Sequence, residues 1–473
     1  MSDGPKASER THGVPVEVGA LVVQVRGPVF RPDDDGYDEE RAGFQTAFRH
    51  QPAVIVGATG PADVRAAVEF AGTNGLPVAV QATGHGLSTP AAGGVLISTR
   101  RMTAVRVDAD TRAAWFEAGV NWRPVIQAAT PHGLVPLSGS APDVGAVSYT
   151  LGGGLGLLAR RYGYAADHVR GIDVVTADAR LHHVTADSDP DLFWALRGGR
   201  DNFGVVTSLE VDLVPVARLY GGGLFFDADL VADVLHAYRH WTTTVPDEMT
   251  SSVAVLPFPD LPAVPAPLRG RYVAHVRIAY SGEPAAGEQL VAPLRAVGPR
   301  LIDALEEMPY AESGSIYNEP TAPEAYYGDN AMLRAFDASA VQAVLALAGP
   351  DAPVPCIVQL RHLGGALARP PVVANAVGHR DARYLLHILS PLGESDSSAA
   401  RPVHQRLFAA LAPWTIGRSL NFIFDENPTT DQIRTAYDPD DYQRLTERKA
   451  IYDPTNMFRL NHNIPPVARR TDG

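Results

Sequence analysis

The chain has 473 residues, of which 45% are hydrophobic and 20% charged, as is typical of a soluble globular protein with two or more domains. Its formal net charge of -13 argues against nucleic acid or an anionic membrane as the main partner, because both require a positively charged face. No apolar run approaches the ~20 residues of a membrane span, and residues 1–27 lack the apolar core of a signal peptide, so we expect a cytoplasmic protein. The single cysteine, Cys356, excludes an intramolecular disulfide framework and a cysteine-based metal site, and we expect no metal.

The N-terminal part of the chain alternates between helical and strand patterns. Residues 37–50 have a helix-like pattern, and the run 53–57 then predicts a strand. Pro61 opens a helix that Gly75 ends, and a second strand follows at 78–80. Together these elements predict a βαβ unit.

The second strand runs into the sequence Gly84-His85-Gly86. Glycine has no Cβ, so the two flanking residues let the backbone turn and approach a ligand closely, and the histidine is presented at the end of the strand. A lone Gly-His-Gly is a weak motif, for which a turn histidine without chemistry is the alternative. Motifs elsewhere in the chain are therefore needed to distinguish a histidine at a ligand site from a histidine in a simple turn.

From residue 94 onward the pattern is mostly β, with one helix, and then becomes rich in glycine. Backbone without side chains can lie along a ligand, and its bare N–H groups are available to phosphate oxygens. The predicted strands are 95–98, 104–107 and 113–118, the helix contains Val125 and ends at Gly133, and the glycine-rich stretches are 138–145 and 151–156.

Residues 154–159, Gly-Leu-Gly-Leu-Leu-Ala, match the G-x-G-x-x-A fingerprint of nicotinamide dinucleotide sites, with Asp173 at a suitable distance. That fingerprint requires a strand directly before it and a full helix after it. Here Gly163 stops any helix early, and Asp173 starts the strand 172–176 instead of ending one. We therefore reject the nicotinamide interpretation, which would predict NAD(P) binding and a colourless protein.

Motifs in the right order along nearly the whole chain resemble those of the berberine bridge enzyme-like FAD-linked oxidases. These oxidases belong to the vanillyl-alcohol-oxidase superfamily, which has PCMH-type FAD-binding domains. Such a set is far more specific than any one motif alone. The motifs are Gly-His-Gly at 84–86, Leu-Gly-Gly-Gly-Leu-Gly at 151–156, Asp-Leu-Phe-Trp-Ala-Leu-Arg-Gly-Gly at 191–199, Asn-Phe-Gly-Val-Val-Thr at 202–207, and Tyr-Asp-Pro-Thr-Asn-Met-Phe-Arg-Leu-Asn-His-Asn-Ile-Pro-Pro at 452–466.

The resemblance implies an α+β fold, in which a PCMH-type FAD-binding domain of two subdomains is joined to a substrate domain of antiparallel sheet covered by helices. It also implies that the end of the chain returns to the FAD-binding domain. We expect an N-terminal tail at 1–36, the FAD-binding domain at 37–216, the substrate-binding domain at 217–415 and a C-terminal segment at 416–473.

The resemblance further implies FAD as cofactor, with one covalent bond between the imidazole of His85 and the 8α-methyl carbon of the flavin. Neutral imidazole is a nucleophile at pH 7, which suits this role. Many relatives add a second bond from a cysteine just before a Pro-x-Val-Gly sequence. This chain has Ala141 at that place and Cys356 far away, so we expect a single bond. Thr83 stands where relatives often have glycine, but Gly84 and its glycine neighbour after His85 keep the pyrophosphate cradle.

The other residues assigned to the cofactor follow the same motifs. Asn461 and Asn463 point the same way on a predicted final strand and would face the flavin or its pocket. Val144 and Tyr149 are expected beside the isoalloxazine ring, where they would set oxygen access. The full set is His85, Ala82, Thr83, Gly84, Gly86, Leu87, Ser140, Ala141, Val144, Gly145, Tyr149, Gly152, Gly153, Gly154, Gly204, Val205, Val206, Asn461 and Asn463.

Catalytic candidates are few, and we assign no base. In the strand-like run 356–363, Gln359 and Arg361 alternate with apolar residues, which predicts either a pocket wall or a solvated sheet face. Tyr149 is the third candidate. Many relatives have a tyrosine that serves as or assists the base where this chain has Ser419.

The function that follows is oxidation of a hydroxyl or activated C–H group by hydride transfer to flavin N5, with reoxidation by molecular oxygen. The expected substrate is a natural-product-like small molecule such as a polyketide, phenol, alkaloid or sugar, in a setting of secondary metabolism. The alternatives are an FAD dehydrogenase with another electron acceptor, and a flavin-carrying binding protein without turnover.

Overall fold

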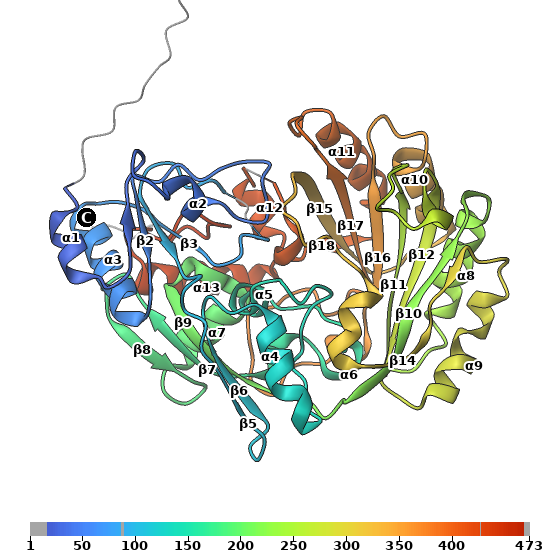
Figure 1. Ribbon diagram of the computed structural model, residues 1–473, viewed down its shortest axis with the longest axis horizontal. Helices are drawn as coiled ribbons and strands as arrows, with labels where there is room; N and C mark the ends of the chain where they lie inside the picture. The colour runs from blue at the N-terminus through green and yellow to red at the C-terminus, as the bar shows by residue number, and fades with distance from the viewer. Residues whose placement is uncertain (1–16, 87–88, 426, 468–473) are drawn as a thin grey trace, which may run out of the picture.

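The computed structural model describes residues 17–86, 89–425 and 427–467, which form an α+β fold of three β-sheets in two halves (Figure 1). Two smaller sheets form the half on the left of Figure 1, and one large sheet forms the half on the right. Over these residues, no helix has the length and apolar character needed to cross a membrane.

The first sheet is parallel apart from its edge strand β1, which is antiparallel to β2. Helix α3 (Pro61–Thr73) begins with a proline, whose missing N–H is not needed in a first turn, and its apolar side packs on this sheet. The predicted βαβ unit is present, with β4 between its two strands. Across the sheet the order is β1 (Val29–Phe30), β2 (Val54–Gly57), β4 (Val95–Ser98) and β3 (Val78–Gln81).

Residues 19–30, which we expected within an N-terminal tail, belong to this packed unit. Helix α1 (Gly19–Gln24) shares the apolar core of α3, and β1 follows it. The Asp63 carboxylate accepts hydrogen bonds from the backbone N–H groups of Arg26 and Gly27, at 2.8 and 3.1 Å. These contacts join parts of the chain far apart in sequence, so the local pattern did not predict them.

The helix expected over 37–50 is much shorter. Helix α2 spans Tyr37–Arg41, and the chain then runs irregularly against the loop after β3, where the N–H of Phe44 donates to the carbonyl of Thr83 at 2.9 Å. A Cβ on Gly43 would lie 2.9 Å from the Cα of Gly84, so this approach requires glycine. Contact with the loop that carries His85 overrides the helical pattern.

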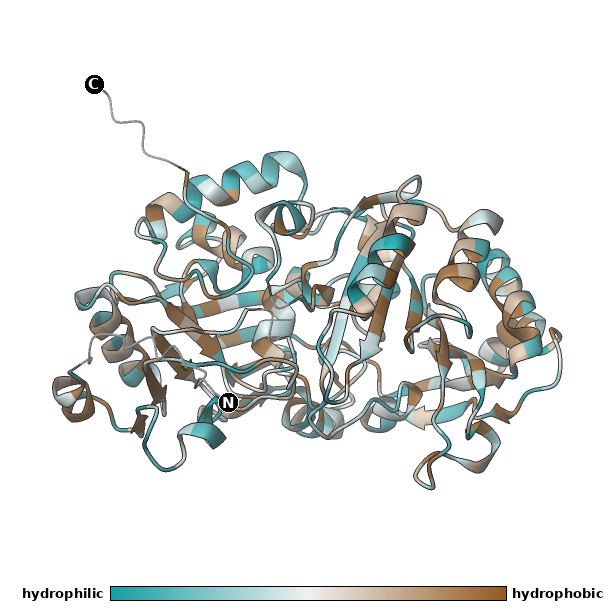
Figure 2. Ribbon diagram, turned by 90° about the horizontal axis from the view of Figure 1, so that it is seen from above, coloured by the Kyte–Doolittle hydropathy of each residue, from teal (hydrophilic) through white to brown (hydrophobic). Residues whose placement is uncertain are grey.

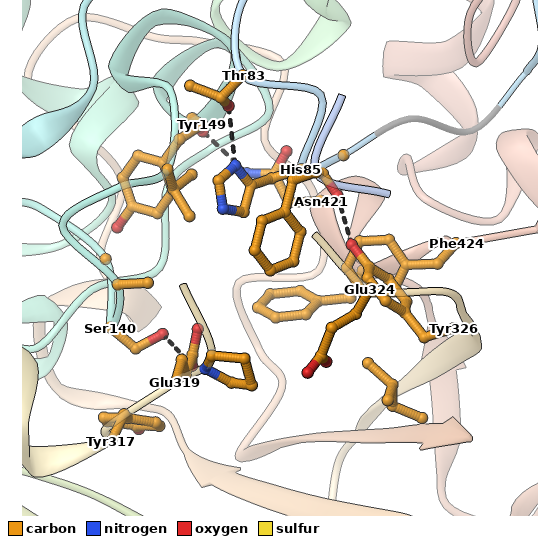
Figure 3. Close-up of a pocket in the computed structure, with 18 of the residues that line it drawn as sticks. Thr83, His85, Ser140, Tyr149, Tyr317, Glu319, Glu324, Tyr326, Asn421 and Phe424 are labelled. Carbon is orange, nitrogen blue, oxygen red and sulfur yellow. Dashed lines mark hydrogen bonds between the residues drawn. The ribbon is translucent and has the colours of Figure 1, made fainter. Parts of the chain in front are cut away.

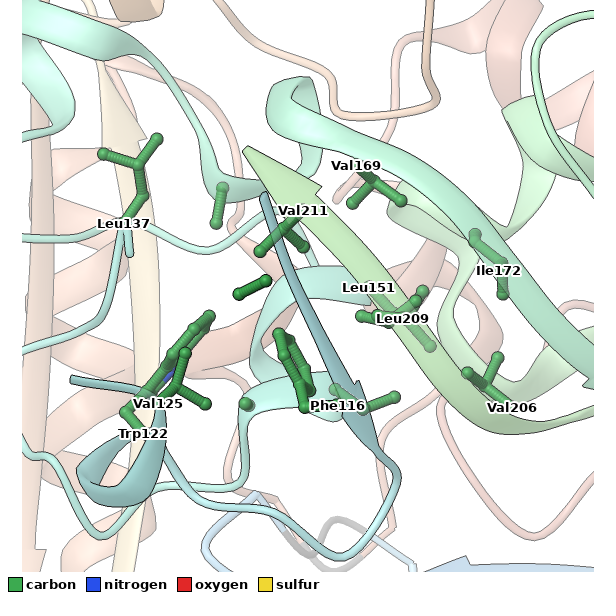
Figure 4. Close-up of a cluster of buried hydrophobic side chains, with 14 of the residues drawn as sticks. Phe116, Trp122, Val125, Leu137, Leu151, Val169, Ile172, Val206, Leu209 and Val211 are labelled. Atoms are coloured by element: carbon green, nitrogen blue, oxygen red, sulfur yellow. The ribbon is translucent and has the colours of Figure 1, made fainter. Parts of the chain in front are cut away.

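The second sheet is antiparallel and supports an apolar core under the glycine-rich loops. In this core the ring of Trp122 on α4 (Trp122–Ala129) packs edge-on against Phe116 of β6 (Ala113–Glu117), with centroids 5.7 Å apart, beside Val125 (Figure 4). Its strands, in order, are β5 (Val105–Asp108), β6 (Ala113–Glu117), β9 (Val205–Asp212), β7 (Val169–Val175) and β8 (Leu181–Val184). The helices of this region are α4 (Trp122–Ala129), α5 (Ala146–Leu151), α6 (Ala159–Tyr162) and α7 (Pro190–Gly199).

The third sheet is antiparallel, and helices cover one of its faces (Figures 1 and 2). Apolar side chains alternate toward these helices, which leaves the other face toward the first two sheets. The strands are β13 (Ile302–Asp303), β10 (Arg218–Phe226), β12 (Tyr272–Tyr280), β11 (Met249–Pro257), β16 (Ile357–His362), β17 (Tyr384–Pro391), β15 (Tyr326–Leu333) and β18 (Thr415–Gly417), with β14 (Glu306–Pro309) paired to β10. The covering helices are α8 (Val231–Trp241), α9 (Pro284–Arg295), α10 (Ala338–Ala348) and α11 (Ala400–Leu411).

After the third sheet the chain returns to the first two sheets through α12 (Thr430–Arg434) and α13 (Pro439–Tyr452). The carbonyl of Met457 accepts a hydrogen bond from Val78 of β3 at 3.0 Å. The final strand expected at Asn461 and Asn463 does not form, and this segment is irregular. Its backbone is bonded by side chains instead of a neighbouring strand, since Asn202 binds the carbonyl of His462 and the N–H of Ile464 at 3.0 and 2.8 Å.

Candidate active site

A cavity of about 1310 Å³ lies between the two halves of the molecule. The loop after β3 and the loop 139–145 form one wall, and residues of β12, β16 and β17 form the opposite wall. A pocket for one drug-sized ligand usually measures ~300–1,000 Å³. This cavity therefore has room for a large cofactor together with a substrate.

His85 lines this cavity from the loop after β3 (Figure 3). Its Nδ1 lies 2.9 Å from Thr83 Oγ1, and its ring stacks on that of Phe44 with centroids 4.0 Å apart. Tyr326 holds the backbone of the loop, because its hydroxyl donates to the carbonyl of His85 at 2.6 Å. Burial lowers the pKa of His85 below its ordinary value of 6.5, although nearby carboxylates act in the opposite direction. The imidazole is therefore neutral at pH 7, with Nδ1 engaged by Thr83.

Two loops beside His85 present unpaired backbone N–H groups. Within the described part of the chain, no N–H of residues 82–86 donates a hydrogen bond, and the same holds for Ser140, Ala141 and Asp143. Backbone N–H groups without partners in the protein favour anions such as phosphate. Gly84 turns the first loop at a φ of +72°, which favours glycine. The two loops thus fit the pyrophosphate of FAD.

Most residues assigned to the cofactor from the sequence line this cavity. They come from the loop after β3, the glycine-rich loop before α5, helix α5 itself, the start of β9 and the segment after α13. The residues concerned are Ala82, Thr83, Gly84, His85, Gly86, Ser140, Ala141, Val144, Gly145, Tyr149, Val206 and Asn461. Leu87 lies outside the described residues.

Gly152 of the second glycine-rich stretch and Gly204 of the β9 motif allow close packing of the chain on itself. A Cβ on Gly152 would lie 1.9 Å from Asn421 Oδ1, and a Cβ on Gly204 would lie 2.5 Å from the carbonyl oxygen of Val175. The high density of glycine in the sequence does not by itself distinguish glycines that allow close packing within the chain from glycines that contact a ligand. The assigned residues absent from the cavity wall are Gly152, Gly153, Gly154, Gly204, Val205 and Asn463.

The polar face of the third sheet forms the wall opposite His85. Arg277 of β12 and Arg361 of β16 both pair with Ser252 of β11, which lies between these strands, so the three residues form a row across the sheet. Gln359 pairs with His387 of β17 in the next row. The alternation in 356–363 predicted a polar side with Gln359 and Arg361, and both line the cavity.

A chain of hydrogen bonds crosses this wall. Gln359 Oε1 lies 2.6 Å from His387 Nε2, Gln359 Nε2 donates to Ser252 Oγ at 3.2 Å, and Ser252 Oγ lies 2.9 Å from the hydroxyl of Tyr317. Because an amide oxygen only accepts, Nε2 of His387 is the donor and its Nδ1 carries a lone pair. Burial and two neighbouring arginines lower the pKa of His387 to about 3, so this imidazole is neutral.

The buried hydroxyl of Tyr149 has no partner among the described residues. Burial raises the pKa of Tyr149 well above its ordinary value. The hydroxyl therefore stays protonated at neutral pH, and it can donate a hydrogen bond to a ligand but does not act as a base.

Several cavity residues carried no signal in the sequence. Apart from His462, which belongs to the 452–466 motif, they lie on segments between the recognisable motifs, and only the fold brings them to His85 (Figure 3). The Asn421 amide, for example, donates to the carbonyl of Tyr149 at 2.8 Å, next to the position Ser419 at which we looked for a tyrosine. The missed residues include Phe44, Arg200, His275, Arg277, Tyr317, Glu319, Glu324, Tyr326, His387, Asn421, Phe422, Phe424 and His462.

Two family models match the chain. Residues 52–185 match a model described as "FAD binding domain", and residues 432–465 match one described as "Berberine and berberine like". The first match contains the loop of His85 and the glycine-rich loops, and the second contains α13 and the segment that returns to the cavity.

Curated relatives and solved structures are similar over nearly the whole chain. An (R)-6-hydroxynicotine oxidase of Paenarthrobacter nicotinovorans is 28% identical over 94% of this chain and 98% of its own length. A chitooligosaccharide oxidase of Gibberella zeae is 24% identical over 97% of both chains. The crystal structure of 6-hydroxy-D-nicotine oxidase from Arthrobacter nicotinovorans superposes with a TM-score of 0.78 at 24% identity, covering 93% of this chain and 98% of that one.

Proposed function

Since the chain belongs to the berberine bridge enzyme-like FAD-linked oxidoreductases, we propose that it is an oxidase that carries one covalently bound FAD. The proposed reaction removes two electrons from a hydroxyl or activated C–H group of a natural-product-like small molecule and passes them to molecular oxygen. The chemistry that FAD supplies when bound is acceptance of a hydride.

One observation carries this proposal: a neutral imidazole lies beside two loops with unpaired N–H groups, in a cavity of about 1310 Å³. The loops 82–86 and 139–145 would hold the pyrophosphate. His85 would bond the flavin through Nε2, because Thr83 occupies Nδ1 at 2.9 Å. Cys356 is buried in the core between the third sheet and its helices, so it supplies no second bond.

The residues of the opposite wall bind and orient the substrate. Neither a guanidinium nor an amide accepts a proton as a base, so we propose binding roles for Arg361 and Gln359 and a base role for neither. Tyr149 would act as a hydrogen-bond donor.

The purified protein tests this function through its flavin absorbance. We expect bleaching under anaerobic conditions by at least one compound of a panel of sugars, phenols and hydroxylated heterocycles. When air is admitted, colour should return within seconds with one equivalent of hydrogen peroxide. Reduced protein that stays colourless in air would instead indicate a dehydrogenase with another acceptor, and a flavin that no compound bleaches would indicate a binding protein.

A further inference from the structure

Two buried arginines on the cavity wall lack the partners that buried arginines have elsewhere in this protein. Arg277 and Arg361 are each only 8% exposed and both line the cavity. Arg277 donates from Nε to His275 Nδ1 at 3.2 Å, whereas Arg361 has a single long contact of 3.5 Å to Gln359 Oε1. The Nε of Arg361 is buried with no partner, and neither guanidinium forms an ion pair with a carboxylate in the described ranges.

Other buried arginines show what a structural role looks like. Arg197, which is fully buried, donates to the carbonyls of Phe193, Val373 and Ala374 at 3.1, 3.2 and 2.6 Å. Arg160 likewise donates to backbone carbonyls and lies near Asp247. The N–H groups of Arg197 and Arg160 donate hydrogen bonds within the protein. Most N–H groups of Arg277 and Arg361 donate to no residue in the described part of the chain and are available to a ligand.

The two cations are held close together by aromatic rings. The guanidinium carbons of Arg277 and Arg361 lie 4.7 and 5.0 Å from the centroid of the same ring, that of Tyr317, and Arg361 also lies 5.1 Å from Phe422. Both pair with Ser252 across the sheet, which fixes their spacing. Aromatic faces stabilise such cations by about 0.5–2 kcal/mol, but they leave the N–H edges free.

Placing two like charges together away from water is unfavourable unless a counter-charge joins them. Glu319 acts on Arg277 through space, but it is exposed and accepts a hydrogen bond from Ser140 at 2.7 Å. The loops that would hold the FAD pyrophosphate lie on the opposite wall, which leaves the pair free for the second occupant of the cavity.

We propose that Arg277 and Arg361 form an anion site, and that the substrate of this protein carries a carboxylate besides the group that is oxidised. A planar guanidinium matches a carboxylate through two parallel hydrogen bonds, and two guanidinium groups supply enough donors for both oxygens. The inference rests on the proposed function, because it names the substrate class of the same cavity.

The test measures binding by isothermal titration calorimetry to the full-length protein as purified. The probes are acetate, benzoate and 2-naphthoate, each compared with its neutral amide at constant ionic strength. We expect at least one carboxylate to bind tenfold or more tightly than its amide. Arg277→Gln and Arg361→Gln should each weaken that binding by about 10- to 100-fold, as loss of a charge-assisted hydrogen bond predicts, and Arg361→Lys should weaken it less.

Arg271→Gln is the matched control, because Arg271 directly precedes β12, the strand that contains Arg277. Its side chain is 46% exposed, pairs with Asp227 and does not line the cavity. It should change the dissociation constant less than twofold. Equal binding of every carboxylate and its amide would overturn the inference, and this comparison needs no variant to fold. Unchanged carboxylate binding in the Gln variants, with a shifted flavin spectrum, would also overturn it and assign the arginines to the cofactor. Flavin content is measured separately, so absence of flavin contradicts the proposed function and not this inference.

Discussion

Lys449 of α13 fixes the segment that brings the end of the chain back to the cavity. Its side chain and that of Asp453 are both 0% exposed, and their charged groups lie 2.7 Å apart. The ammonium also donates to the carbonyls of Asn202 and Phe458, at 2.6 and 2.9 Å. The Asp453 carboxylate in turn accepts from the N–H groups of Met457 and Phe458, at 2.7 and 2.8 Å.

Lys449→Met should therefore release this segment at a large cost. The variant leaves the Asp453 carboxylate buried without its counter-charge and two carbonyls without their donor. Removal of one partner from a buried ion pair costs about 3–5 kcal/mol. Adding Asp453→Asn should recover about 1–3 kcal/mol relative to the sum of the single changes, because the unpaired charge is then removed as well.

Native-state hydrogen exchange measures the loss of stability of this segment in Lys449→Met. A local measurement is needed because a chain with two halves need not unfold in a single step. Exchange at the amides of Met457 and Phe458 should accelerate by about 10²- to 10⁴-fold in Lys449→Met, which corresponds to about 3–5 kcal/mol. Arg448→Met is the control, since Arg448 pairs with Asp191 near the surface and its loss should cost about 0–1 kcal/mol. If both variants exchange at the same rate, the buried pair does not hold the segment.

Two further predictions concern the histidines of the cavity. Thr83→Val removes the hydroxyl that lies 2.9 Å from His85 Nδ1 and accepts a hydrogen bond from the N–H of Gly145 at 3.3 Å. When FAD is added to apoprotein of this variant, covalent attachment should be about 5- to 10-fold slower, the equivalent of about 1 kcal/mol. Thr83→Ser should restore the rate of attachment. An unchanged time course of acid-stable fluorescence would remove the orienting role of Thr83. Burial and the nearby Arg200 lower the pKa of His462 to about 3, whereas in the unfolded chain this histidine has a pKa near 6.5. Because the unfolded chain therefore binds the proton more tightly, the free energy of unfolding should fall as pH drops from about 6.5 toward 3. For this one group the fall is up to about 1.4 kcal/mol per pH unit. Urea unfolding at pH 7, 6 and 5 should show a shallower slope for His462→Gln, and an identical slope would contradict the assignment.

The parts of the site that the sequence predicted are those in which a local pattern fixes the direction of a side chain. The period of two in 356–363 separated Gln359 and Arg361 from their apolar neighbours, and the structure places both on the cavity wall. The glycines around His85 predicted a loop that turns and approaches a ligand closely. Gly84 does turn the loop, at a φ of +72°, and its close neighbour within the protein is the backbone of Gly43.

The parts that failed depend on contacts between distant segments. Period two placed Asn461 and Asn463 on a strand, but the side chain of Asn202 binds this backbone, so Asn461 lines the cavity and Asn463 does not. Tyr326 and Tyr317 carry no motif, and they reach the site only because the third sheet faces the first two. Local pattern contains no information on such pairings.

Whether the flavin stays with the polypeptide on denaturation shows whether His85 is bonded to it. The purified protein is precipitated with acid, run on a denaturing gel and inspected under ultraviolet light, beside His85→Ala and the control His132→Ala, which alters a histidine outside the cavity. We expect fluorescence to stay with the wild-type and His132→Ala bands and to be lost from the His85→Ala band. Flavin released into the supernatant from the wild type, or retained by His85→Ala, would contradict this expectation.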